Sequence, residues 1–115
     1  MAKRKDRRQG RKPVASSDYT DDEGNVLTLR QELSAGTIRK IGEPPASAAA
    51  SVDDAWQRRE EALFERLAVR WEIAGLPIEK QSMLLGRYRM ASDEERRWVR
   101  ETIAAHLERF IPDLA

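Results

Sequence analysis

The feature that most constrains the fold of this chain is a periodic run of apolar residues near its C-terminal end. Residues suited to one buried helical face recur there every three or four positions, namely Trp98, Val99, Thr102, Ile103, His106, Leu107 and Phe110. Ser92 followed by Glu95 is a capping box, which favours the start of a helix, and Pro112 would stop one. The pattern therefore predicts a long amphipathic helix that begins near Ser92 and ends before Pro112.

Two segments upstream also predict helices. Ser51 with Asp54 is an N-terminal capping pattern, and the apolar residues behind it share one helical face: Trp56, Leu63, Phe64, Leu67, Trp71 and Ala74. Gly75 and Pro77 would end this helix and open a second one over about residues 78–89, which carries Ile78, Met83, Leu84, Leu85 and Tyr88. The three helices predict an all-α fold, a small three-helix bundle or orthogonal three-helix domain over residues 52–113.

A linker and an arm precede this domain. Residues 43–51 contain two prolines and small residues with nothing to pack, which predicts a linker. Residues 19–42 hold a turn signal at 21–25 and six irregularly spaced aliphatic residues: Val26, Leu27, Leu29, Leu33, Ile38 and Ile41. We expect a partly ordered arm, extended or weakly helical, in which residues 26–29 could be a short strand or Thr28 could cap a short helix. The six aliphatic residues need a surface, either the chain's own domain or a partner, on which to dock.

The charge of the chain is unevenly distributed, although its total is only +1. Residues 1–12 carry seven cations against the single acid Asp6: Lys3, Arg4, Lys5, Arg7, Arg8, Arg11 and Lys12. Because residues 1–18 have little to bury, we expect them to form a disordered basic tail. Such a tail attracts the phosphates of RNA or DNA without reading their sequence. The alternative is a charged end that only adds solubility, and a membrane partner is not expected because no apolar anchor adjoins the cations.

Five arginines offer a weaker hypothesis of nucleic-acid binding. Arg87, Arg89, Arg96, Arg97 and Arg100 flank the turn between the second and third predicted helices, as in a helix-turn-helix protein. The third helix, however, opens with three consecutive acids at 93–95, whose carboxylates would face the DNA phosphates. The sequence therefore disfavours sequence-specific DNA binding.

Catalysis is not expected from these residues. The chain has no cysteine, and its single histidine, His106, lies on the inner or boundary face of the last predicted helix. No phosphate loop, metal-ligand spacing or nucleophile motif accompanies it, so we expect no enzymatic activity, cofactor, metal or small-molecule substrate. Trp56, Trp71 and Trp98 are expected to fill the core. No apolar run is long enough to span a bilayer, and we expect a cytoplasmic location.

Two functional hypotheses follow from the sequence. In the first, the chain is a non-enzymatic accessory protein whose tail contacts RNA or DNA phosphates while the helical domain docks on a partner. In the second, the domain is a protein–protein interaction or dimerisation module, and the tail merely adds solubility. The first is slightly preferred because the +6 charge of residues 1–12 is joined to a nearly neutral helical domain, with −2 over residues 51–115.

Overall fold

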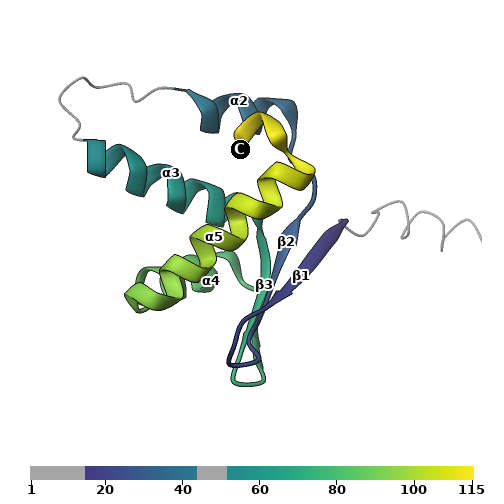
Figure 1. The fold of residues 1–115 in the computed structure, drawn as a ribbon, viewed down its shortest axis with the longest axis vertical. Coiled ribbons are helices and arrows are strands. Elements are labelled where there is room, and N and C mark those ends of the chain that lie inside the picture. The colour runs from purple at the N-terminus through teal and green to yellow at the C-terminus, as the bar shows by residue number, and fades with distance from the viewer. Residues whose placement is uncertain (1–14, 44–51) are drawn as a thin grey trace, which may run out of the picture.

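A four-stranded antiparallel sheet lies at the centre of the fold, so the all-α prediction is wrong. The computed structural model describes residues 15–43 and 52–115, and Figure 1 shows the arrangement of its elements. In chain order they are β1 (Ser16–Thr20), β2 (Val26–Arg30), α2 (Ala35–Gly42), α3 (Val52–Leu67), β3 (Ala68–Ile73), β4 (Leu76–Ile78), α4 (Gln81–Arg89), α5 (Asp93–Phe110) and the short 3-10 helix η1 (Pro112–Leu114). The strands follow one another across the sheet in the order β1, β2, β3, β4.

The arm that we expected to be extended or weakly helical contains a β-hairpin. Strands β1 and β2 pair in a register that sets Tyr19 opposite Leu27. The predicted turn connects them, because the Asp21 carboxylate accepts hydrogen bonds from the backbone N–H groups of Glu23 (2.8 Å) and Asn25 (3.0 Å). The turn signal was therefore correct, but its role as the tip of a hairpin was missed.

The remainder of the arm forms helix α2, which packs beside the C-terminal end of the chain (Figure 1). Its side chains Ile38 and Ile41 are partly buried against the core. Residues 16–18, which we assigned to the tail, belong to strand β1. The rest of the predicted tail up to residue 14, and the predicted linker apart from Glu43, lie outside the described residues.

The first predicted helix is too long, because its C-terminal part is strand β3. Helix α3 ends at Leu67, and the next six residues, Ala-Val-Arg-Trp-Glu-Ile, include the β-branched and aromatic types that favour strands. Trp71, only 2% exposed, lies opposite Leu27 of β2. The spacing of four residues from Leu67 to Trp71 fits a helix, but pairing with β2 satisfies the backbone hydrogen bonds of this segment as a strand instead.

The turn between β3 and β4 also replaces a predicted helix end. Ala74 and Gly75 have φ angles of 53° and 79°, as the two central residues of a type I′ hairpin turn require. The Asn25 side-chain oxygen accepts a hydrogen bond of 3.0 Å from the Ala74 N–H, which ties the two hairpins together. Ile78, expected in the second helix, instead ends strand β4.

Helices α3, α4 and α5 cover one face of the sheet (Figure 1). Their buried side chains meet Leu27, Leu29 and Trp71 of the sheet in one core, to which the helices contribute Leu63, Phe64, Leu67, Leu84, Tyr88, Val99, Ile103 and Leu107. The predicted start of the last helix is confirmed: Ser92 Oγ accepts from the Glu95 N–H (3.1 Å), and the Ser92 N–H donates to Glu95 Oε1 (3.0 Å). This local signal predicted the start of the helix correctly, although the predicted fold class was wrong.

Two glycines provide a matched test of the fold by the same chemical change. Gly75→Ala should lower the free energy of unfolding by about 1 kcal/mol, because φ at this position is +79° and a Cβ disfavours that conformation. Gly86→Ala should raise the free energy of unfolding by about 0.5–1 kcal/mol, because Gly86 lies within α4 and an added Cβ would meet no atom within 4 Å. Urea unfolding of the two variants measures both. Effects of the same sign would contradict this description of the turn and of α4.

Candidate functional site

The sequence-predicted nucleic-acid residues cannot be placed in the fold. Lys3, Arg4, Lys5, Arg7, Arg8, Arg11 and Lys12 all lie outside the described residues. Their proposed role therefore rests on their charge and their spacing in the sequence.

The aliphatic residues of the predicted docking arm pack on the chain's own domain. Leu27 and Leu29 of β2 are fully buried, and Leu33, Ile38 and Ile41 are partly buried against the same core. Val26 is half-buried at the start of β2. The arm thus completes the core of this chain.

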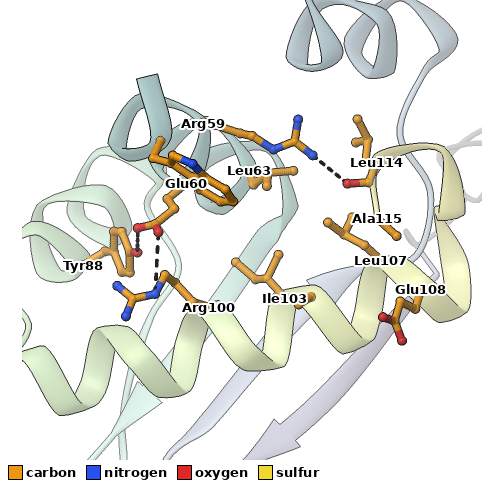
Figure 2. A pocket seen from close by; sticks show the side chains of 12 residues that line it. Arg59, Glu60, Leu63, Tyr88, Arg100, Ile103, Leu107, Glu108, Leu114 and Ala115 are labelled. Carbon is orange, nitrogen blue, oxygen red and sulfur yellow. Dashed lines mark hydrogen bonds and ion pairs between the residues drawn. The ribbon is translucent and has the colours of Figure 1, made fainter. Parts of the chain in front are cut away.

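An apolar groove lies between helices α3 and α5 and is bounded by the C-terminal end of the chain (Figure 2). The cavity has a volume of about 200 Å³. Leu63 from α3, Ile103 and Leu107 from α5, and Leu114 from η1 form its apolar surface together with the small side chains Ala104 and Ala115. Trp56 lines the same groove and is 61% exposed. In size and composition the groove suits an apolar side chain of a partner.

Charged residues surround the groove and are held by the protein. At one end Arg59 donates a hydrogen bond of 2.7 Å to the Leu114 carbonyl oxygen. At the other end the Glu60 carboxylate accepts from the Tyr88 hydroxyl (3.4 Å) and forms an ion pair with Arg100 (3.6 Å), as Figure 2 shows. Burial, followed by the charge of Glu60, raises the pKa of Tyr88 to about 12. Tyr88 is therefore a neutral hydrogen-bond donor at physiological pH.

The placement of Trp56 corrects the prediction that all three tryptophans fill the core. Trp71 is buried and Trp98 partly buried, but Trp56 projects from the first half of α3. A signal for this was present in the sequence: residues 57–61, Gln-Arg-Arg-Glu-Glu, are all polar and separate Trp56 from the next large apolar residue of the stripe. This polar run weakens the prediction that Trp56 lies in the core.

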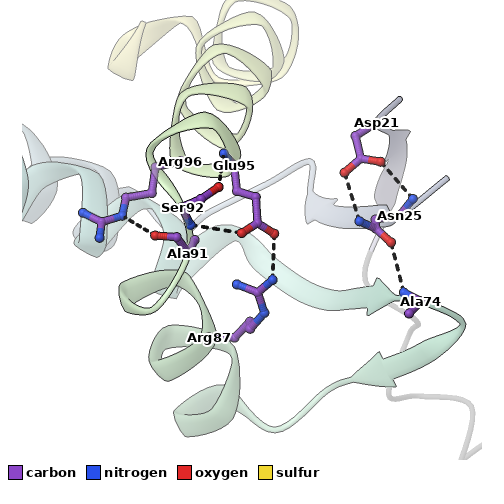
Figure 3. A network of polar contacts seen from close by, with 8 residues as sticks. All are labelled: Asp21, Asn25, Ala74, Arg87, Ala91, Ser92, Glu95 and Arg96. Atoms are coloured by element: carbon purple, nitrogen blue, oxygen red, sulfur yellow. Dashed lines mark hydrogen bonds and ion pairs between the residues drawn. The ribbon is translucent and has the colours of Figure 1, made fainter. Parts of the chain in front are cut away.

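Most of the arginines around the turn between α4 and α5 contact acceptors of the protein itself, and Figure 3 shows this for Arg87 and Arg96. Arg87 pairs with Glu95 at 2.7 Å. Arg89 pairs with Glu61 at 2.8 Å, and Arg96 donates to the carbonyl oxygens of residues 89 and 91. The hydrogen bond from the Ser92 backbone, and then Arg87, hold the pKa of Glu95 below its usual value. Arg100 also pairs with Glu60, so three of the five arginines are paired with carboxylates, whereas Arg97 is exposed. Most of the cluster therefore stabilises the packing of α4 and α5 within the fold.

His106 occupies a closed polar position between α5 and the first hairpin. It is 1% exposed. Its Nε2 lies 2.6 Å from the Arg30 carbonyl oxygen, which can only accept, so Nε2 carries the proton. Nδ1 then accepts from the Tyr19 hydroxyl, also at 2.6 Å. Burial lowers the pKa of His106, and the neutral ring makes both hydrogen bonds. This pair of hydrogen bonds, the His106 tie, links helix α5 to strands β1 and β2.

The folded part has a net charge opposite to that of the tail. Residues 15–43 and 52–115 contain fourteen Lys and Arg against nineteen Asp and Glu, a net charge of −5. Within these ranges no three His, Cys, Asp or Glu side chains are grouped as metal ligands would be. Among the described helices, none combines the length and the apolar character that crossing a membrane requires.

Comparison with known proteins identifies no relative: no protein-family model, no curated protein and no solved structure matches the chain.

The His106 tie predicts that stability falls in mild acid. Because the pKa of His106 in the folded protein lies below the value of about 6.5 in the unfolded chain, the unfolded chain binds a proton at higher pH than the folded protein does. The contribution of His106 to the free energy of unfolding is therefore complete above about pH 6.5 and decreases as the pH falls below that value. His106 is the only histidine, so its Hε1 resonance can be followed by NMR without ambiguity and should titrate with a midpoint below about 6.5. His106→Gln should reduce the difference in unfolding free energy between about pH 7.5 and 5.5. A midpoint at or above 6.5 would contradict the buried neutral ring.

Proposed function

We propose that this chain is a non-enzymatic, cytoplasmic accessory protein that associates with nucleic acid through its basic tail and with protein through its folded part. The observation that carries the proposal is the separation of charge. Seven cations lie between residues 3 and 12, whereas the described part has a net charge of −5. A polyanion is attracted to the basic tail and repelled by the folded part.

Chemistry supports phosphate as the ligand of the tail. Four of its seven cations are arginines, whose planar guanidinium groups bind phosphate through two parallel hydrogen bonds. Attraction of this kind follows the backbone of RNA or DNA and is independent of base sequence. The folded part adds little to it, because Arg87 and Arg89 are paired with carboxylates and α5 begins with three acids.

The second half of the proposal, docking on protein, is supported by the groove between α3 and α5. It joins an apolar surface to an exposed tryptophan, the residue type most enriched among those that dominate binding energy at interfaces. If the tail only adds solubility, this groove still favours a protein–protein interaction module, which is the second candidate function.

The tail is tested with full-length protein in which the seven cations are replaced by glutamine. We expect the unaltered chain to bind generic RNA or duplex DNA with an affinity that falls steeply between about 50 and 200 mM salt, with a log–log slope near −5. The glutamine variant should lose this binding. Fluorescence anisotropy with labelled oligonucleotides measures both.

Two controls separate phosphate attraction from other effects. Replacing the four tail arginines by lysine keeps the charge and should preserve the salt slope. Arg97→Gln, which removes an exposed cation of the folded part, should change affinity little. Equal binding by the unaltered chain and the glutamine variant, or no binding by either, would leave only the interaction module.

A further inference from the structure

Trp56 and the groove beside it form one surface that contains both an apolar projection and an apolar hollow. The projection is the indole of Trp56, more than half exposed on the first half of α3. The hollow is formed by Leu63, Ile103, Leu107 and Leu114, which are themselves nearly inaccessible to solvent. A large exposed aromatic residue that continues into an apolar depression is typical of a protein interface.

We propose that the occupant of this groove is a second copy of the same chain, in a two-fold dimer in which Trp56 of each protomer enters the α3–α5 groove of the other. The inference rests on the docking half of the proposed function and is independent of what the tail binds. Two-fold interfaces use the same patch on both subunits, so the patch must carry a projection and its complement together. The surface around Trp56 meets that condition within a single pair of helices.

The charges around the groove favour a like partner over a strongly charged one. Among the side chains that line the cavity, Arg59 and Arg100 are balanced by Glu60 and Glu108. The two arginines would repel a basic segment, and the two glutamates would repel an acidic one. Neither kind of partner therefore gains electrostatic attraction from the groove as a whole. A second copy brings the same balanced set, and a two-fold axis can place an arginine of one protomer near a glutamate of the other.

The side chains in the groove leave space for the incoming indole. Ala104 on α5 and Ala115 at the end of the chain are small and exposed among larger neighbours. Tyr88 and Arg59 at the two ends are fixed by hydrogen bonds to Glu60 and Leu114. The groove is therefore preformed, and its occupation requires no rearrangement of the helices.

A dimer would also place two tails on one particle. Two linked polycations bind one nucleic-acid strand more tightly than either alone, because the second contact is intramolecular. The dimer thus gives the groove a role in the proposed association with nucleic acid.

Sedimentation equilibrium of the full chain, without nucleic acid, tests the dimer. Between about 1 and 500 µM, a range that spans the Kd of a modest interface, the apparent mass should rise from the monomer mass of 13.2 kDa toward twice that value. Trp56→Ala should weaken dimerisation by tenfold or more. Ala104→Glu, which keeps Trp56 but adds a carboxylate in the groove, should do the same. Met90→Ala serves as the control, because Met90 is exposed but does not line the groove.

A fluorescence experiment tests the intermolecular contact directly. The chain has no cysteine, so a bimane label on Glu101→Cys is the only one attached. Glu101 is exposed on α5, one turn before Ala104, and does not line the groove. In a labelled chain that also carries Trp56→Phe, quenching should appear on adding unlabelled wild-type protein, and should be much weaker on adding unlabelled Trp56→Phe protein. Far-UV circular dichroism establishes that each variant retains the fold.

The possible outcomes decide the proposal. A chain that stays monomeric at about 500 µM overturns it and leaves the groove to a different protein. Dimerisation that is unchanged by Trp56→Ala and Ala104→Glu also overturns it, because the copies then meet elsewhere. Nucleic-acid binding is measured separately on the tail variants, so a failure of the tail hypothesis and a failure of the dimer can be told apart.

Discussion

The pairing of strand β2 with strand β3 is the interaction on which the rest of the structure depends. It sets Leu27 against Trp71 across the middle of the sheet and creates the apolar face that the helices cover. It also joins the two hairpins of the described residues. Within each hairpin the paired strands are neighbours in the sequence, whereas β2 and β3 are far apart in it. Most of the core side chains of α3, α4 and α5 are buried because this face exists. The tie from His106 to Arg30 and Tyr19 strengthens the same arrangement from the helical side.

The sequence predicted those elements whose signals are local. The capping box at Ser92 and the periodic face through Leu107 specified α5, and the acids and glycine at 21–25 specified a turn. Strand β3 was missed because its evidence is not local. A tryptophan four residues after Leu67 continues a helical stripe, and only the presence of β2 beside it makes the extended conformation more stable.

The candidate site was harder to predict for a related reason. Trp56 shares a stripe with Leu63 and Phe64, and the polar residues 57–61 between them are only a weak signal that the stripe has no packing partners at Trp56. In the fold, the second half of α3 lies over the core, whereas Trp56 remains exposed beside the groove. The arginines near the α4–α5 turn show the converse. They are grouped in sequence, but carboxylates from α3 and α5 pair with three of the five. The charge of a segment therefore predicts a binding surface only when the elements facing it are known.

The long-range pairing of β2 with β3 has a consequence for how the molecule can be assembled. Residues 15–43 form one hairpin and one helix, and residues 52–115 form the other hairpin and the remaining helices. Neither part completes the sheet alone: without β2, strand β3 has a bare edge and Trp71 loses the side chain opposite it. The first part is thus related to the second as a donated strand is to its acceptor. The core is therefore completed only when residues 15–43 reach a segment that is distant from them in the sequence, so the two parts of the chain are expected to unfold together.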